Sequence, residues 1–180
     1  MTKIVFKCLR CGRCCKNLFR EIEEGLFGLN VFPDEKELFP KKFVSPYIGI
    51  GWGTSGPKYV VSYQLNINVC VHLSKDNLCK VYDKRPLACQ AFPLLSAGPF
   101  GTSIPDPNEC TFVEKVEKEA GSLNNLFPIT PKKFRAPQGW QAVRKINNRV
   151  EKSYTSHLMD ARVLWRFDLK NKEWQIASAF

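Results

Sequence analysis

Four cysteines lie close together near the N-terminus, in the sequence CLRCGRCC that covers residues 8–15. Four more follow singly along the chain. Thiolate sulfur binds zinc, iron and iron–sulfur clusters, whereas a buried thiol that only fills space needs no such spacing. The pattern therefore predicts a site for a metal ion or cluster. The candidate ligands are Cys8, Cys11, Cys14, Cys15, Cys70, Cys79, Cys89 and Cys110.

The spacing of the first cysteines favours an iron–sulfur centre over zinc. Cys8, Cys11 and Cys14 are three residues apart, and bacterial ferredoxin-type runs hold a [4Fe–4S] cluster with this spacing and a distant fourth cysteine. Structural zinc more often takes one such pair and a second pair much later, so zinc is the alternative. Side chains of neighbouring residues usually diverge. We therefore expect Cys15 to turn away from Cys14, toward a second site or another metal of a polynuclear one.

The number of centres is open, because eight thiols allow two four-sulfur sites or one cluster with free thiols. His72 is a further candidate ligand, since imidazole suits zinc and iron. It would face the same side as Cys70 in an extended strand. A hydrogen-bonded, partly buried histidine is the commoner outcome, and more so for His157. A disulfide framework is disfavoured, because the N-terminus lacks the apolar run of a secretory signal.

The bulk composition is that of a globular protein. The 180 residues are 44% hydrophobic and 24% charged, which fits one domain or one domain with an extension. No apolar run approaches the ~18–20 residues of a membrane span, so we expect a cytoplasmic protein. The net charge of +10 favours acidic partners, either an acidic protein or a nucleic acid. A solvated helix face explains the same C-terminal basic residues, which are Lys132, Lys133, Arg135, Arg144, Lys145, Arg149 and Lys152.

The predicted elements give an α+β fold. We expect one or two strands over residues 58–73, a short helix from Pro86 that carries Cys89, and a helix from Thr111 to Gly121 with Glu114 at capping-box spacing. Cys110 would then lie at a helix N-terminus, which favours a thiolate. Residues 138–158 have one apolar helical face, and residues 161–177 alternate as a β-hairpin around LKNK. This predicts a loop-rich cysteine-centred region with a small antiparallel sheet, two or three helices and a C-terminal hairpin. Residues 1–95 would form the metal-binding region and residues 96–180 an α+β extension packed on it.

A glycine-rich run is the chain's candidate for a ligand cradle. Gly49, Gly51 and Gly53 would let backbone approach S-adenosylmethionine closely. A dinucleotide-type loop needs a strand directly before and a helix directly after, but Pro46 and Pro57 flank this run. A tight loop or a bulged hairpin is therefore the favoured interpretation.

Two linked motifs resemble the CxxCxxCC family of zinc- or iron-chelating domains, which includes flagellin lysine N-methylase. The first is CLRCGRCC. The second resembles C-x-HL…C-x-(I/V)Y-x-x-RP-x-x-C-x-x-FP and consists here of Cys70, His72, Leu73, Cys79, Tyr82, Arg85, Pro86, Cys89, Phe92 and Pro93. Gln90 stands where the family often has arginine. The resemblance covers about residues 6–95.

The resemblance implies a cysteine-bound metal or iron–sulfur centre. It also implies, as an alternative, methyl transfer from S-adenosylmethionine to protein lysine side chains. The catalytic residues of such an enzyme are unknown in this sequence. A third interpretation is a basic interaction module for nucleic acid or protein with a structural zinc ion.

Overall fold

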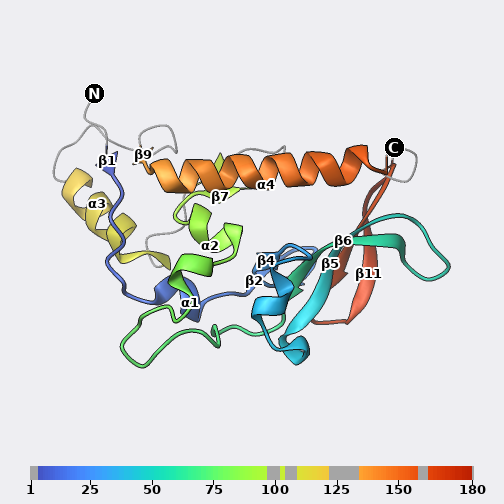
Figure 1. Cartoon of the computed structure of the whole chain (residues 1–180), viewed down its shortest axis with the longest axis horizontal. Coiled ribbons are helices and arrows are strands. Elements are labelled where there is room, and N and C mark those ends of the chain that lie inside the picture. The colour runs from blue at the N-terminus through green and yellow to red at the C-terminus, as the bar shows by residue number, and fades with distance from the viewer. Residues whose placement is uncertain (1–3, 97–101, 104–108, 122–133, 158–161, 180) are drawn as a thin grey trace. The chain divides into compact units, whose positions relative to one another are not determined.

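The structure is a computed structural model that describes residues 4–96, 102–103, 109–121, 134–157 and 162–179 (Figure 1). Helices and antiparallel sheets occur together, so the predicted α+β class is confirmed. The chain divides into two compact units. Unit 1 comprises Met1–Lys16 and His72–Asn147, and unit 2 comprises Asn17–Val71 and Asn148–Phe180. Each unit thus takes chain from both sides of residue 95, and a domain boundary at that residue stays a prediction.

Unit 2 contains a five-stranded antiparallel sheet with the order β11-β10-β5-β6-β4. Its strands are β4 Asn30–Val31, β5 Val44–Trp52, β6 Pro57–Leu65, β10 Val163–Asp168 and β11 Glu173–Ala179. The predicted C-terminal hairpin is confirmed as β10 and β11. It joins the sheet where Leu164 pairs with Ile50 of β5. A short hairpin of β2 (Arg20–Ile22) and β3 (Gly25–Phe27) also belongs to this unit.

The glycine-rich run forms the bulged hairpin that the sequence favours. β5 and β6 pair with register shifts between Pro46 and Ile48 and between Ile48 and Gly49. At the turn, the Gly53 N–H donates to the Gly56 carbonyl over 2.9 Å. The expected strand to residue 73 is wrong, because β6 ends at Leu65. The Asn68 carbonyl and side-chain oxygen instead accept the N–H groups of Leu18 and Phe19.

The core of unit 2 lies beside this sheet. Buried apolar side chains form one cluster of Leu18, Val31, Phe39 and Leu65. Burial of each such side chain stabilises the fold by about 1.5–3 kcal/mol. Two short 3₁₀ turns, Lys36–Leu38 and Lys41–Phe43, lead from β4 to β5. Leu38 ends the first turn and packs against the cluster, and Phe39, the next residue, belongs to it.

Two buried polar side chains link separate segments of unit 2. Gln64 is fully buried. Its amide Nε2 donates to the carbonyls of Pro46 and Phe167, both over 2.8 Å, and its Oε1 accepts the Gly28 N–H over 2.8 Å. Asp168 is also fully buried. Its carboxylate accepts the backbone N–H groups of Leu26, Lys170 and Asn171. These groups satisfy polar atoms that would otherwise be costly to bury.

Unit 1 holds the shorter elements. Its helices are α1 Arg13–Lys16, α2 Leu87–Ala91 and α3 Thr111–Gly121, with a 3₁₀ turn at Tyr82–Lys84. β1 (Ile4–Val5) pairs in parallel with β9 (Phe134–Arg135), and β7 (Leu95–Ser96) pairs with β8 (Thr102–Ser103). The bounds of α3 confirm the predicted helix from Thr111 to Gly121. The buried apolar side chains of this unit include Leu87, Ala91, Leu94, Val113, Ala142 and Val143.

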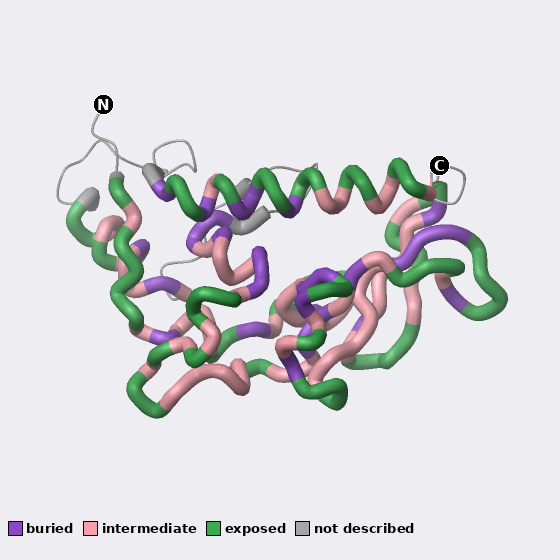
Figure 2. Tube along the Cα trace, viewed as in Figure 1, coloured by how far each residue is buried: buried purple, intermediate pink, exposed green. Residues whose placement is uncertain are grey.

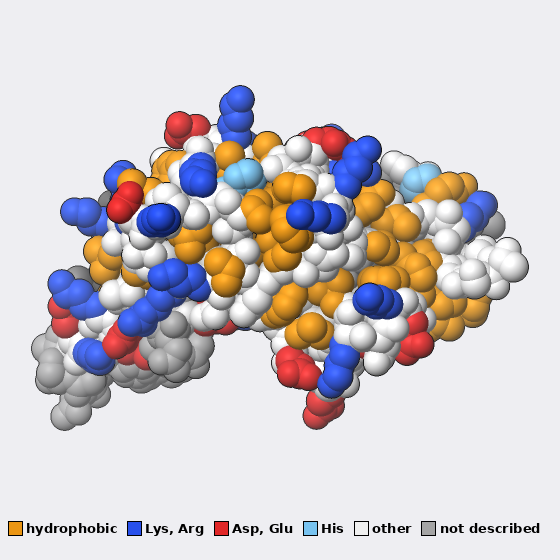
Figure 3. Space-filling model, turned by 90° about the horizontal axis from the view of Figure 1, so that it is seen from below, with side chains coloured by type: hydrophobic (Ala, Val, Ile, Leu, Met, Phe, Trp, Pro, Cys, Tyr) orange, Lys and Arg blue, Asp and Glu red, His pale blue; other side chains and the backbone are white. Residues whose placement is uncertain are grey.

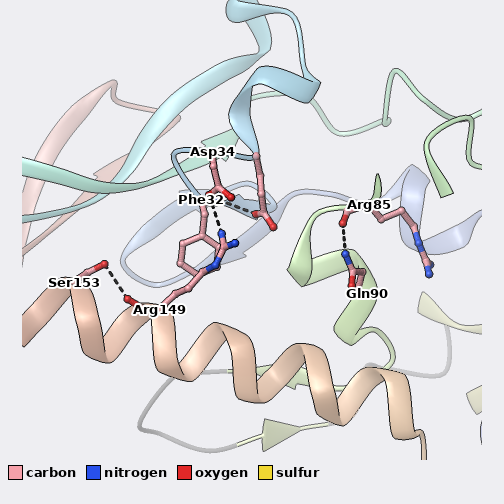
Figure 4. Close-up of polar contacts among 7 residues, drawn as sticks. Phe32, Asp34, Arg85, Gln90, Arg149 and Ser153 are labelled. Atoms are coloured by element: carbon pink, nitrogen blue, oxygen red, sulfur yellow. Dashed lines mark hydrogen bonds and ion pairs between the residues drawn. The ribbon is translucent and has the colours of Figure 1, made fainter. Parts of the chain in front are cut away.

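Helix α4 spans Pro137–Thr155. Its predicted apolar face is confirmed by the burial of Val143 and Ile146, and Figure 2 shows buried and exposed residues alternating along the helix. Gly139 lies so close to α2 that a Cβ atom would sit 2.8 Å from the Ala91 carbonyl oxygen. In unit 2, Arg149 donates to Asp34 over 2.7 Å (Figure 4). Leu158, at the end of the predicted apolar face, lies outside the described residues, as do the basic residues Lys132 and Lys133.

None of the described helices has the length and apolar composition needed to cross a membrane.

Candidate metal centre

The first cysteine motif is a tightly curved loop that runs into a short helix. Arg10 and Gly12 have positive φ angles of 52° and 73°, which turn the chain between Cys8 and Cys14. Glycine adopts this conformation without a Cβ penalty. The Cys15 N–H then donates to the Gly12 carbonyl over 3.0 Å. Helix α1 therefore presents Cys14 and Cys15 directly after the curve.

The second motif begins with a narrow turn. Leu73 and Cys79 form an isolated antiparallel bridge, and the Lys80 N–H donates to the His72 carbonyl over 2.9 Å. Asn77 lies at the tip with a φ of 60°. The tip touches the first motif, because a Cβ atom on Gly12 would lie 2.9 Å from Asn77 Oδ1. The two motifs therefore adjoin within unit 1.

The thiols of Cys14 and Cys15 are hydrogen-bonded to each other. The two side chains therefore interact, and whether Cys15 serves a second site or another metal of the same site stays a prediction. The bond, burial and the charges of Cys15, Cys89 and Cys8 raise the pKa of Cys14. For Cys15, the bond from Cys14 and the Arg85 charge outweigh burial and lower its pKa to about 7. Cys8 and Cys14 from the first motif thus share one electrostatic environment with Cys89 from α2.

The start of α3 contacts the same region. Burial alone would raise the pKa of Cys11, but hydrogen bonds from the Thr111 side chain and from the Arg13 and Thr111 backbones outweigh it, and the pKa is lowered. Cys110 precedes α3 and accepts bonds from the Val113 and Phe112 N–H groups, as expected at a helix N-terminus. Its burial is the larger effect, however, and with the charges of Cys11 and Cys8 it raises the pKa of Cys110. The helix N-terminus thus acts on Cys110 in the expected direction, and burial outweighs it.

Charged and polar side chains fix these elements to one another. Arg13, beside Cys14, donates to Glu114 of α3 over 2.5 Å, and Lys118 donates to the same carboxylate over 2.6 Å. Hydrogen bonds from Lys118 and Arg13 lower the pKa of Glu114. Gln90 donates to the Arg85 carbonyl over 2.5 Å (Figure 4). Arg13, Glu114 and Thr111 were not among the predicted site residues, although the capping-box spacing drew attention to the last two.

The remaining candidates lie in different surroundings. Cys79 is half-buried in the turn of the second motif. Cys70 belongs to unit 2 and packs against its core cluster. His157 stacks on Tyr59 with ring centroids 4.4 Å apart. The expectation that Cys70 and His72 share the face of a strand is wrong, because neither residue lies in one. Whether Cys70 or His72 binds metal stays a prediction.

The donor set suits a thiolate-bound metal. All eight cysteines are free thiols, and Cys11 and Cys110 accept N–H bonds of the kind that stabilise ligating sulfur. Over the described residues, no three side chains of His, Cys, Asp or Glu are already grouped closely enough to hold an ion.

The glycines of the β5–β6 hairpin have a local explanation. A Cβ atom on Gly49 would lie 2.2 Å from Cγ of Pro57, and one on Gly53 would lie 2.8 Å from the Gly56 carbonyl oxygen. Gly51 has a φ of 78°. Close cross-strand packing and turn geometry thus require glycine here without a ligand. Binding of S-adenosylmethionine by these residues stays a prediction.

Comparison with known protein families shows to which family the chain belongs. The family model named CxxCxxCC, described as "Putative zinc- or iron-chelating domain", matches residues 7–119. The chain belongs to the CxxCxxCC family. The match includes all eight cysteines and extends beyond residue 95 to take in Cys110 and most of α3. Family membership supports metal binding in general. No curated protein matches the chain, and no solved structure matches it.

Proposed function

We propose that this CxxCxxCC protein holds a cysteine-ligated [4Fe–4S] cluster, with zinc as the alternative metal. The observation that carries the proposal is the contact of the two cysteine motifs, where a Cβ atom on Gly12 would lie 2.9 Å from Asn77 Oδ1, and it is supported by the charges of Cys8 and Cys89 that raise the pKa of Cys14. Thiols from two distant motifs thus act on one side chain. The three-residue spacing from Cys8 to Cys14 favours the cluster over zinc.

The proposed ligands come first from the cysteines of unit 1, and Cys70 remains a predicted eighth. A bound cluster would supply one-electron chemistry, whereas zinc would supply a structural cross-link. The protein's part is to hold the sulfurs and balance their charge. The charge of Arg85 lowers the pKa of Cys15, and hydrogen bonds from the backbone N–H groups of Arg13 and Thr111 lower the pKa of Cys11. The proposed unit 1 ligands are Cys8, Cys11, Cys14, Cys15, Cys79, Cys89 and Cys110.

Anaerobic purification with metal analysis tests this function. We expect brown protein with broad visible absorption and with iron and acid-labile sulfide bound in equal amounts. Colourless protein with stoichiometric zinc would support the alternative. Protein that takes up neither metal, after anaerobic reconstitution with iron and sulfide or with zinc, would refute the proposal.

Cys70→Ser tests whether Cys70 is a metal ligand. Metal content that falls as it does for Cys89→Ser would add Cys70 to the ligands. Wild-type metal content would make Cys70 a thiol of the unit 2 core, in keeping with its packing against Leu18, Val31, Phe39 and Leu65.

The other predicted activities rest on sequence resemblance and charge. Equilibrium dialysis of metal-replete protein against S-adenosylmethionine tests the lysine methyltransferase alternative, and an absence of binding would remove it. The predicted nucleic-acid or acidic-protein contact would use Arg144, Lys145, Arg149 and Lys152 of α4. Arg149 already pairs with Asp34, which leaves fewer cations for such a partner. A cytoplasmic location also stays a prediction.

A further inference from the structure

The two cysteine loops of unit 1 carry a large excess of positive charge. Residues 5–16 and 72–90 contain eight Lys and Arg side chains and only two acids, Asp76 and Asp83. Six of these cations are exposed, and we call them the basic collar. They are Lys7, Arg10, Lys16, Lys75, Lys80 and Lys84.

Among the described residues, the cations of the basic collar have no salt-bridge partner, whereas the two other cations nearby have side-chain contacts of their own. Arg13 pairs with Glu114, and Arg85 lies over the Tyr82 ring at 3.8 Å. Within the described residues, no salt bridge reaches any cation of the collar. Exposed cations without acidic partners attract negative charge from outside the chain.

Apolar side chains are exposed at positions close to these cations in the sequence. The exposed fractions are 60% for Val5, 44% for Leu9, 43% for Leu78 and 43% for Tyr82. The contact of Gly12 with Asn77 brings the loop of Leu9 next to the turn that carries Leu78. At the left of the view, Figure 3 shows Lys and Arg side chains interspersed with apolar side chains and with some Asp and Glu side chains. Apolar groups with a charged margin are typical of protein interfaces.

We propose that the basic collar and its four apolar side chains form a docking surface for an acidic polypeptide. Such a partner would carry apolar side chains between its carboxylates. Charge complementarity would speed the encounter and fix its orientation, while Leu9 and Leu78 would lose water on contact. This inference does not depend on which metal the cysteines bind.

The apolar composition favours a polypeptide over a nucleic acid. Single-stranded nucleic acid is bound through aromatic side chains on which bases stack. Tyr82 is the exposed aromatic residue of this surface, and the Arg85 guanidinium covers its ring. The other exposed apolar residues, Val5, Leu9 and Leu78, are aliphatic and offer no stacking surface.

The test compares two triple variants that each remove three positive charges. K16Q/K80Q/K84Q removes part of the collar, and R144Q/K145Q/K152Q removes exposed cations of α4. The probes are a random copolymer of glutamate and tyrosine, polyglutamate and a single-stranded oligonucleotide, with affinities measured by fluorescence anisotropy. We expect the collar variant to bind the copolymer about tenfold more weakly than wild type, since three exposed ion pairs are lost. The α4 variant should bind as wild type does.

A second variant, L9S/L78S, tests the apolar part of the surface. It should lose affinity for the copolymer and keep its affinity for polyglutamate. Equal weakening by the collar and α4 variants would overturn the proposal, because it would reflect attraction to overall charge. Tighter binding of the oligonucleotide than of the copolymer would also overturn it. Metal content, measured on every variant, shows separately whether the metal-binding proposal holds.

Discussion

Gly12 and Asn77 are in direct contact at the meeting point of the two cysteine motifs. A Cβ atom on Gly12 would lie 2.9 Å from Oδ1 and 3.1 Å from Cβ of Asn77. Both residues have positive φ angles, 73° and 60°. The contact needs a residue without a Cβ atom at position 12 and a left-handed backbone conformation at Asn77. It thereby joins the loop that carries Cys11 to the turn that carries Cys79.

Gly12→Ala should separate these motifs. A non-glycine residue at this φ costs roughly 1–2 kcal/mol, and the added methyl group would collide with Asn77. We expect the variant to fold and to bind less metal than wild type, as measured by metal content per protein and by visible absorption.

Asn77→Gly serves as the partner substitution. Glycine tolerates the positive φ at residue 77 and removes the side chain that meets Gly12. The G12A/N77G double variant should therefore recover part of the lost metal. Equal metal loss in the single and double variants would show that the contact does not hold the motifs together.

Cys14→Ser and Cys89→Ser should each lower bound metal by roughly half or more, because a hydroxyl replaces a thiolate ligand. Metal analysis after anaerobic purification measures this. Ala88→Ser is the matched control, since it adds a hydroxyl to the same turn of α2 without removing a thiol. Retention of full metal content by both cysteine variants would exclude these residues from the site.

Gln64→Leu should destabilise unit 2. The leucine cannot bond Gly28, Pro46 or Phe167, and each buried polar group left without a partner costs about 1–3 kcal/mol. Urea unfolding followed by tryptophan fluorescence should show a lower midpoint. The exposed Gln138→Leu of α4 should change the free energy of unfolding by no more than about 0.5 kcal/mol. A Gln64→Leu midpoint equal to that of wild type would contradict the role of this amide.

Asp168 should make folding sensitive to acid. Burial alone would raise the pKa of its carboxyl, but the N–H donors of Leu26, Lys170 and Asn171 outweigh it and lower the pKa below the ordinary value. A lowered pKa in the folded state adds stability above the unfolded pKa of about 3.9, and this stability is lost as pH falls through the folded value.

Asp168→Asn provides the comparison for this pH dependence. The variant should be less stable than wild type at neutral pH and should lose less stability between pH 5 and about pH 2, as followed by urea midpoints across that range. Parallel pH profiles for the two proteins would show that another group carries the acid sensitivity.

Local sequence patterns were enough to predict the helices and hairpins whose residues mainly contact residues nearby in the sequence. The alternation around LKNK predicted the β10–β11 hairpin, and Thr111 and Gly121 predicted the bounds of α3. The positions of Pro46 and Pro57 correctly favoured a bulged hairpin. The α+β class followed from the same reasoning, whereas the family was inferred from the resemblance of the two cysteine motifs.

Contacts between distant segments were beyond local patterns. No spacing rule reveals that Ile50 pairs with Leu164, or that Glu114 meets Arg13. β6 ends earlier than its β-branched residues suggest, because Asn66 and Asn68 bond other segments with their side chains. The interaction between the Cys14 and Cys15 thiols was also not expected, because neighbouring side chains of a helical turn usually point apart.

The place of β10 between β5 and β11 constrains the order in which a nascent chain can complete its sheet. Residues 44–65 leave the ribosome long before residue 163, so until then β5 has a row of unpaired N–H and C=O groups along one side. Such an open strand invites pairing with other chains. A fragment that stops at residue 95 would keep that strand open permanently and should therefore aggregate when the full-length chain does not.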